Sequence, residues 1–288
     1  MRIAVTGASG FLGASLIRAL SARGDQAIAL TRDPSRCSPR LVGVDCPRYP
    51  CTPEGLRLAT NSGPVTVVHT ATCYGRFGES SADLVDANVV LPLRLLGESQ
   101  RIDRWISMGT ALPAEVSPYA ESKAQFGRWL ERGDLQWPAR VELLLQHLYG
   151  PGDDSGKFLT WVIRGCLKGE RLELSEGIQR RDFIHVDDVV RAILTILDNP
   201  SIGGSPSVLG VGSGEARSLR EVVLSIHAAT GRRSELVFGA RPLRSSEPMV
   251  MVEGSPDLRA LGWCPRVSWT NGLAELIEQE RKLLSCES

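Results

Sequence analysis

Residues 6–13 read TGASGFLG and place Gly7, Gly10 and Gly13 at intervals of three residues. A short apolar run precedes the segment and apolar residues at helical spacing follow it, so the pattern predicts a strand, a tight turn and a helix. Such a turn directs backbone N–H groups and the positive end of a helix dipole toward one point, which suits a phosphate group. We expect Gly7 to permit the turn, Gly10 to admit a pyrophosphate and Gly13 to let the helix pack on the strand. The alternative is an ordinary glycine-rich loop, but the flanking strand and helix favour dinucleotide binding.

The same alternation of strand and helix patterns continues along the chain. Strand-like apolar runs fall at 2–6, 26–31, 41–44, 65–71, 104–108 and 141–146. Helical patterns fall near 11–23, 80–100, 119–132, 157–168, 187–198, 217–230 and 271–284, while 34–40, 46–55 and 199–206 carry turn and loop residues. This alternation predicts an α/β fold, a doubly wound parallel sheet covered by helices on both faces. We expect residues 1–150 to bind the dinucleotide and carry the catalytic residues. Residues 151–288 should form mainly a small substrate-binding lobe, with some segments returning to the core of the sheet.

Composition narrows the class of protein. The 288 residues carry 33 basic and 33 acidic side chains, so no basic field predicts binding to nucleic acid or to an anionic membrane. No apolar run reaches the ~18 residues that span a bilayer. Met1 leads directly into a strand, so we expect no signal peptide. The seven cysteines are scattered without metal-ligand spacing, so we expect reduced thiols, no metal site and a cytoplasmic protein.

The end of the second expected strand indicates which dinucleotide is bound. In NAD-binding folds an acidic residue at this position accepts hydrogen bonds from the ribose hydroxyls. Here Thr31 stands at the strand end, Arg32 follows it, and Asp33 and Arg36 come shortly after. Arginine side chains suit a 2′-phosphate, so we expect NADP as the cofactor. The alternative is a solvated turn that contains arginines by chance in an arginine-rich chain.

A second motif contains residues that could exchange a proton with a substrate. The sequence SPYAESKAQF places Tyr119 and Lys123 four residues apart on an expected helix, and therefore on one face of it. An ammonium close to the phenol would lower the tyrosine pKa from its ordinary value of about 10 and make proton exchange with a substrate oxygen feasible. The alternative is a surface lysine near a packed tyrosine.

The third member of such a site should be a hydroxyl at the end of the preceding strand. The sequence RWISMGTAL offers Ser107 and Thr110. We favour Thr110, because it falls at the end of the strand where a reacting oxygen could be reached, whereas Ser107 falls inside it.

Further motifs occur in order along nearly the whole chain. They are VVHTA at 67–71, DANVVLPL around Asn88, the Y-x-x-x-K pair, LYGPGDD at 148–154, RRDFIHVDDV at 180–189 and LGWCP at 261–265. Together with the G-x-x-G-x-x-G spacing, this set resembles the extended short-chain dehydrogenase/reductases known as NAD-dependent epimerase/dehydratases. The stretches HTATCYGR, PYAESKAQF, YGPGDDSGKF and QRRDFIHVDDV are most similar to nucleotide-sugar 4-keto-6-deoxyhexose reductases of the CDP-abequose synthase type.

The resemblance implies a Rossmann fold and roles for individual residues. Ala71 would line the cofactor together with the three glycines, and Lys123 would also hold the nicotinamide ribose. Arg181 and Arg244 would bind the diphosphate of a sugar nucleotide from two sides. Further residues expected at the site are Phe11 and Leu12 beside the cofactor, and Tyr74 and Asn88 beside the substrate.

The function implied by the resemblance is reduction of a nucleotide-linked 4-keto-6-deoxyhexose by NADPH in deoxysugar biosynthesis, with Tyr119 protonating the emerging alkoxide. The alternatives are a 4-epimerase with tightly bound NAD(P), a reductase of a non-sugar ketone and a non-catalytic NADP-sensing regulator. A 4,6-dehydratase is set aside, because Ala111 and Leu112 stand where such enzymes carry Asp–Glu. Family members commonly form dimers through a four-helix bundle, so a homodimer is also implied. The nucleotide base and the product stereochemistry stay open.

Overall fold

The computed structural model describes residues 1–36, 38–133, 135–202, 207–243 and 246–287. The chain divides into two compact units. The first comprises Met1–Leu145 with Ala192–Leu209, and the second comprises Gln146–Arg191 with Gly210–Ser288. Each unit is therefore built from two separate stretches of sequence.

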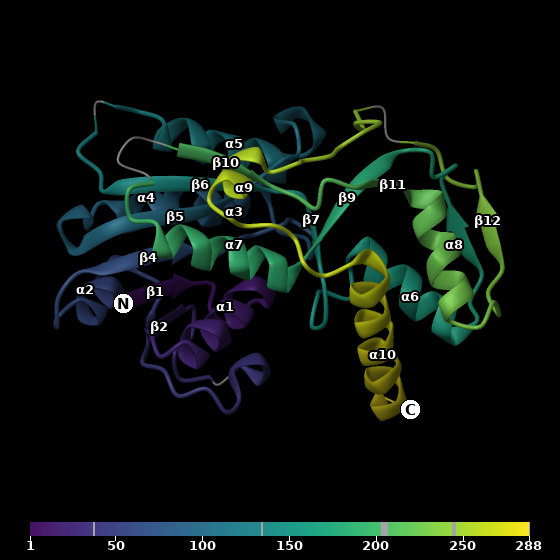
Figure 1. The fold of residues 1–288 in the computed structure, drawn as a ribbon, viewed down its shortest axis with the longest axis horizontal. Helices are drawn as coiled ribbons and strands as arrows, with labels where there is room; N and C mark the ends of the chain where they lie inside the picture. The colour runs from purple at the N-terminus through teal and green to yellow at the C-terminus, as the bar shows by residue number, and fades with distance from the viewer. Residues whose placement is uncertain (37, 134, 203–206, 244–245, 288) are drawn as a thin grey trace. The chain divides into compact units, whose positions relative to one another are not determined.

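The central sheet has seven strands in the order β10-β6-β5-β4-β1-β2-β3. These strands are β1 (Arg2–Thr6), β2 (Gln26–Thr31), β3 (Arg48–Pro50), β4 (Val65–His69), β5 (Ile102–Thr110), β6 (Ala139–Leu145) and β10 (Ser207–Val211). All neighbouring pairs from β6 to β3 are parallel. Figure 1 shows β6, β5, β4, β1 and β2 side by side. The chain builds outward from β1 first to one side and then to the other, which is the doubly wound arrangement. This confirms the predicted fold class.

Helices cover both faces of this sheet. They are α1 (Phe11–Ala22), α2 (Pro53–Ala59), α3 (Ser81–Val85), α4 (Leu91–Leu96), α5 (Pro118–Leu130) and the last part of α7 (Val186–Asp198). Successive residues of β5 point to opposite faces. Trp105 packs near Phe126 of α5 in a buried cluster that also includes residues of α2 and α4, so these helices share one face. Arg104 donates a hydrogen bond to the carbonyl of Ile196 in α7, so α7 reaches the opposite face.

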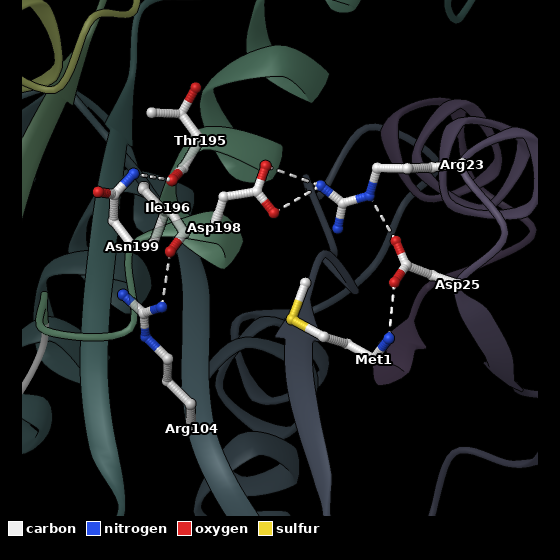
Figure 2. A network of polar contacts seen from close by, with 8 residues as sticks. All are labelled: Met1, Arg23, Asp25, Arg104, Thr195, Ile196, Asp198 and Asn199. Carbon is white, nitrogen blue, oxygen red and sulfur yellow. Dashed lines mark hydrogen bonds and ion pairs between the residues drawn. The ribbon is translucent and has the colours of Figure 1, made fainter.

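A polar network joins α1 to α7 on that second face (Figure 2). Arg23, which caps α1, binds both carboxylate oxygens of Asp198 at 2.8 and 3.0 Å. Arg23 also contacts Asp25, which accepts a hydrogen bond from the N-terminal ammonium of Met1 at 2.7 Å. The buried Arg104 donates to a carbonyl in the last turn of α7 at 2.6 Å. Two guanidinium groups therefore lie at the C-terminal end of α7, where a helix dipole favours positive charge.

The third strand lies where the sequence predicts a loop. The apolar run at 41–44 predicts a strand, but the chain there forms a 3-10 turn, Pro39–Leu41, and β3 follows at Arg48–Pro50. The prediction is wrong because only part of the run is buried, and β3 is a short edge strand that needs no long apolar run. The hydroxyl of Thr52 then caps α2, with Pro53 at its first position.

The helix predicted over 80–100 is divided. The helices α3 and α4 are joined by a π turn, Asp86–Val90, and a 3-10 turn, Ser99–Arg101, precedes β5. Pro92 lies at the start of α4 and has no N–H to donate to the carbonyl four residues earlier, that of Asn88. π turns inside helices often mark functional sites, and this one contains Asn88.

The second unit contains two small sheets, β11-β9-β7 and β12-β8. Their strands are β7 (His147–Tyr149), β8 (Leu172–Leu174), β9 (Arg180–His185), β11 (Ala216–Ser218) and β12 (Leu236–Phe238). The helices are α6 (Phe158–Lys168), α8 (Leu219–Ala229), α9 (Pro256–Ala260) and α10 (Trp269–Glu287). Buried Val162, Ile226 and Leu276 join α6, α8 and α10 in one core. Because β9 is the middle strand of its sheet, its residues are held from both sides.

Candidate active site

The glycine turn lies between the end of β1 and the start of α1. Gly7 has a positive φ of 62°, and a Cβ at this position would lie 2.7 Å from the Cα and the amide nitrogen of Ala71. A Cβ on Gly13 would collide with the carbonyl oxygen of Gly7. Gly10 donates a backbone hydrogen bond to Gly7 at 2.8 Å and occupies the N-cap of α1. The turn therefore keeps a cradle free of side chains at the positive end of a helix, which fits a pyrophosphate group.

The first turn of α1 and the segment after β4 flank this cradle. Phe11 is half-buried and Leu12 is buried. Within this described first turn there is no acidic side chain, so no carboxylate of the turn itself occupies the helix N-terminus. The amide of Ala71 donates to the hydroxyl of Thr6 at 3.2 Å. Ala71 is thus held beside Gly7 by the end of β1.

The loop after β2 contains the residues predicted to select NADP. Thr31 is the last residue of β2 and is buried, whereas Arg32 and Arg36 are exposed. The carboxylate of Asp33 accepts hydrogen bonds from the amide of Ser35 at 3.0 Å and from its hydroxyl at 2.5 Å. The hydroxyl bond and then the amide bond hold the pKa of Asp33 below its ordinary value. The acidic side chain is therefore engaged within the loop while both arginines face solvent.

Tyr119 and Lys123 lie one turn apart on α5. The hydroxyl of Ser117 accepts a hydrogen bond from the amide of Ala120 at 3.2 Å, and Pro118 takes the first helical position, so the helix begins there. Tyr119 is half-buried and Lys123 is only 2% exposed. Their spacing puts the phenol and the ammonium on one face of the helix.

Two neighbouring segments supply the surroundings of the Tyr119 phenol. The side chain of Thr110, the last residue of β5, lies close enough to the phenol to lower its pKa. The ring of Tyr74 lies 4.9 Å from the Tyr119 ring between centroids, and the guanidinium of Arg76 lies 4.7 Å from the centre of the Tyr74 ring. The other candidate hydroxyl, Ser107, is buried within β5 at 1% exposure. The structure therefore brings Thr110 and Tyr74 to Tyr119.

The protonation of Tyr119 differs from what the sequence suggests. Burial raises the pKa of the phenol well above its ordinary value and Tyr74 raises it further, while the Thr110 side chain and the charge of Arg76 lower it. The sequence predicts that Lys123 lowers this pKa, but the lowering contributions come from Thr110 and Arg76. Spacing along a helix does not reveal how deeply a side chain is buried, and burial dominates here. The phenol is protonated at neutral pH.

The ammonium of Lys123 is buried and lies 3.5 Å from the hydroxyl of Thr72. Burial lowers the pKa of Lys123 to about 8, and the charge of Glu142 on β6 opposes this by raising it. Burial raises the pKa of Glu142 to about 7, and the charge of Lys123 opposes that shift. Sequence reasoning missed both Thr72 and Glu142. The one signal for Glu142 is a lone carboxylate within the apolar run VELLL.

The side chain of Asn88 has partners within the protein. Its amide oxygen accepts a hydrogen bond from the backbone of Cys73 at 2.9 Å. Its amide nitrogen donates to the carbonyl of Cys73 at 2.8 Å and to the hydroxyl of Ser122 at 2.9 Å. Both donors of the amide are therefore in use, and Asn88 ties the segment before Tyr74 to α5. A substrate contact at Asn88 would require one of these bonds to open.

Arg181, one of the two predicted diphosphate contacts, belongs to the second unit. Arg181 lies on β9 and is 4% exposed. It binds the carboxylate of Glu247 at 2.8 Å and the carbonyl of Arg180 at 2.9 Å. Burial lowers the pKa of Arg181 and Glu247 raises it. A protein carboxylate therefore holds the guanidinium that was expected to bind phosphate, and Arg244 lies outside the described residues.

Lys157 and Arg181 are two cations of the second unit that both lower the pKa of His147. Burial lowers the pKa of His147 on β7 to about 3, and the charges of Arg181 and Lys157 lower it further. Lys157 in turn binds Asp153 at 2.7 Å. The two cations, each paired with a carboxylate, surround a neutral histidine, and an anion could exchange with either carboxylate.

Across the described ranges, no group of three or more His, Cys, Asp or Glu side chains is placed to hold a metal ion. Among the helices that the structure describes, none has the length and apolar character needed to cross a bilayer.

Comparison with known proteins places this geometry in context. Residues 3–212 match the NAD dependent epimerase/dehydratase family. The chain is 33% identical to a CDP-abequose synthase of Salmonella typhimurium, over 96% of this chain and 97% of that protein. It is 26% identical to MoeE5, solved in complex with UDP-glucose and NAD, with a TM-score of 0.80 over 99% of this chain and 100% of that one. A UDP-glucose 4-epimerase of Thermotoga maritima, solved with UDP-glucose, shares the fold at 23% identity with a TM-score of 0.84, over 99% and 100% of the two chains.

Proposed function

Since this chain belongs to the NAD dependent epimerase/dehydratase family, we propose that it is an NADPH-dependent reductase of a nucleotide-linked 4-keto-6-deoxyhexose. It is an enzyme of the extended short-chain dehydrogenase/reductase type, as are the relatives that it resembles over almost their whole length. In the proposed reaction a hydride reaches C4 of the sugar and Tyr119 protonates the oxygen on that carbon.

The observation that carries the proposal is the 33% identity to a CDP-abequose synthase over 96% of this chain, with Thr110 beside the Tyr119 phenol and Lys123 one helical turn away on α5. A reductase must deliver a proton to the ketone oxygen as the hydride arrives, and a protonated phenol is the form that can do so. A 4-epimerase must first remove a proton from a hydroxyl group, which requires the phenolate. A protonated Tyr119 is therefore the form in which the proposed reductase starts its reaction.

The side chains around Tyr119 then have separate roles. A bound NADPH would supply the hydride. Tyr119 gives its proton to the ketone oxygen, and the Thr110 hydroxyl stabilises the resulting phenolate by donating a hydrogen bond. Lys123 is charged below its pKa of about 8, so its ammonium can hold the nicotinamide ribose one helical turn from Tyr119. A proton from solvent restores the phenol after the ketone has become an alcohol.

The loop after β2 supports NADP as the cofactor. Arg32 and Arg36 are exposed, and the carboxylate of Asp33 is engaged by Ser35 rather than offered to a ribose. A 2′-phosphate would gain charge-assisted hydrogen bonds from the two guanidinium groups. The glycine cradle at Gly7 would receive the pyrophosphate, with Ala71 beside it.

The second unit supports a nucleotide-diphosphate sugar as the substrate. Arg181 is a buried guanidinium whose carboxylate partner, Glu247, could be exchanged for phosphate. A CDP-abequose synthase and the UDP-glucose complex of MoeE5 are among the similar proteins, and both names refer to nucleotide sugars. Residues 1–150 would thus hold the cofactor and the catalytic side chains, and 151–288 would supply most contacts to the substrate.

Incubation with NADPH and a panel of CDP-, dTDP-, GDP- and UDP-linked 4-keto-6-deoxyhexoses tests the proposal. We expect stoichiometric loss of the absorbance of reduced nicotinamide with one nucleotide series, and formation of the 4-hydroxy sugar. The matched control is Tyr119→Phe, which should still bind NADPH. Product formed without net loss of NADPH would show an epimerase instead. Binding of NADPH with no turnover of any ketone would support a non-catalytic sensor.

A further inference from the structure

A row of polar side chains crosses the sheet beneath α5. Glu142 on β6 is in register with Ser107 on β5, Ser107 with His69 on β4, and His69 with Thr6 on β1. The centroid of the His69 ring lies 6.1 Å from that of the Phe126 ring on α5. The row is therefore on the face of the sheet that α5 covers. All four residues of the row are buried. Thr6 and His69 share a hydrogen bond of 2.8 Å. Polar groups buried in a sheet core cost stability unless they are paired, so the carboxylate of Glu142 at the end of the row requires a partner.

Glycines make room for the end of this row. A Cβ on Gly109 of β5 would lie 2.7 Å from Oε1 of Glu142, and a Cβ on Gly127 of α5 would lie 2.8 Å from Oε2. The carboxylate of Glu142 is therefore held between a strand and a helix that both lack side chains at that point. Gly127 comes one helical turn after Lys123, on the same face of α5.

We propose that Glu142 is the buried counter-charge of Lys123, a positioning residue that keeps the ammonium charged beside Thr72 and one turn from Tyr119. This inference rests on the proposed function, which gives Lys123 its catalytic role. It goes beyond that function because it proposes that a carboxylate on β6 sets the pH above which activity falls.

The physical reason is the cost of burying an ammonium. Lys123 is 2% exposed, and its hydrogen bond to Thr72 is with a neutral hydroxyl. A buried amine without an opposite charge loses its proton near neutral pH, and a neutral amine cannot give the nicotinamide ribose the charge-assisted hydrogen bonds that the proposed function assigns to Lys123. Burial lowers the pKa of Lys123 to about 8, and the charge of Glu142 is what raises it.

The other charged and titratable groups around the pair do not replace Glu142. Burial, together with the charge of Lys123, lowers the pKa of His69 well below its ordinary value, so His69 is neutral. Glu131, at the end of α5, raises the pKa of Glu142. Arg140 on β6 lies near Glu142 but donates to two backbone carbonyls. Among the residues that the structure describes, Glu142 is therefore the carboxylate whose charge raises the pKa of Lys123.

The pH dependence follows from these directions. Below pH 7 Glu142 takes up a proton, yet Lys123 is charged there in any case. Between pH 7 and 9 the carboxylate is charged and opposes the loss of the lysine proton. Removing its charge should therefore leave activity near pH 6 unchanged and reduce it increasingly above pH 7.

The chain contains four lysines, which makes a direct titration practical. The protein with [13Cε]lysine gives four signals, and the Lys123→Met variant identifies that of Lys123. We expect a wild-type midpoint near 8. Glu142→Gln, which keeps the shape of the side chain, should lower the midpoint by about 1 pH unit or more. Glu131→Gln, an exposed carboxylate near the same pair, is the matched control and should not lower it.

The outcomes separate this inference from the proposed function. An unchanged Lys123 midpoint in Glu142→Gln, or a wild-type midpoint at the ordinary value of about 10.4, would overturn the inference whether or not a sugar is reduced. A lowered midpoint with no turnover of any nucleotide sugar would support the inference and remove the proposed function.

If Glu142→Gln does not fold, Glu142→Asp is the second variant, because it keeps the charge and only shortens the side chain. In that variant the midpoint must stay near 8, and a fall comparable to that expected for the uncharged variant would contradict the proposal. With a substrate, the alkaline limb of kcat/KM should shift with the midpoint.

Discussion

The rings of Tyr74 and Tyr119 lie against each other, with their centroids 4.9 Å apart and their planes inclined by 37°. The guanidinium of Arg76 lies on the Tyr74 ring, at 4.7 Å from its centre. This contact limits the positions that the Tyr119 phenol can take and keeps it within hydrogen-bonding reach of Thr110. We therefore expect Tyr74 to act on the proposed reaction through its ring and Tyr119 through its hydroxyl.

Removing the Tyr119 hydroxyl should abolish most of the activity. Tyr119→Phe is expected to lower kcat for ketone-dependent oxidation of NADPH by about 10²–10⁴-fold, because positioned proton transfer contributes that much. Tyr74→Phe is the matched control, since it keeps the stacked ring and should retain most of the rate. Steady-state assays of both variants decide the matter. Equal losses in the two variants would mean that the wrong tyrosine has been assigned.

Thr110 should act on the pKa of Tyr119. Its side chain lowers that pKa, so Thr110→Ala should raise the pKa of the phenol and lower kcat by about 10-fold or more. Thr110→Ser restores a hydroxyl and should recover most of the rate. Ser107→Ala removes a hydroxyl buried inside the strand and serves as the comparison. A larger loss of kcat in Ser107→Ala than in Thr110→Ala would reverse the assignment.

Arg32 should distinguish the two dinucleotides. Arg32→Ala should weaken NADPH binding by ~1.5–3 kcal/mol, because the 2′-phosphate loses a charge-assisted partner, and should leave NADH binding nearly unchanged. Calorimetric titration of both cofactors measures this. Arg128→Ala, an exposed arginine on α5 whose partner is Glu121, is the control and should alter neither affinity. A native preference for NADH would rule out the NADP assignment.

Arg181 should anchor the substrate rather than the cofactor. Arg181→Lys keeps a positive charge but loses the forked geometry, so the KM for a nucleotide sugar should rise about tenfold while NADPH affinity stays unchanged. Glu247→Gln removes the carboxylate that competes for Arg181, so its KM should stay the same or fall. Arg171→Ala, in the exposed pair with Glu235, is the control. A wild-type KM in Arg181→Lys, with a raised KM in Glu247→Gln, would contradict the assignment.

The contacts at the end of α7 should differ in their effect on stability (Figure 2). Arg104 is buried and donates to the carbonyl of Ile196, so Arg104→Ala should lower the free energy of unfolding by about 2–4 kcal/mol through a cavity and an unpaired carbonyl. Asp198 is largely exposed in its pair with Arg23, so Asp198→Ala should cost less than about 1 kcal/mol. Urea unfolding midpoints compare the two. Equal midpoints would show that Arg104 contributes no more than a surface pair.

Local features of the fold can be predicted from the sequence alone. The turn at Gly7 depends on which residues tolerate a positive φ, and the start of α5 depends on Ser117 and Pro118. The spacing of Tyr119 and Lys123 depends only on the helical repeat. Such features involve neighbours a few residues apart, so a single sequence contains all the information that they require.

Other features depend on contacts between distant segments, and these arise only in the folded chain. The position of β3 and the division of the helix near Asn88 depended on burial and on hydrogen bonds that local pattern does not specify. The raised pKa of Tyr119 and the lowered pKa of Lys123 both come first from burial, which packing creates. The row that ends at Glu142 needs four strands in register, and register is set between strands rather than within one.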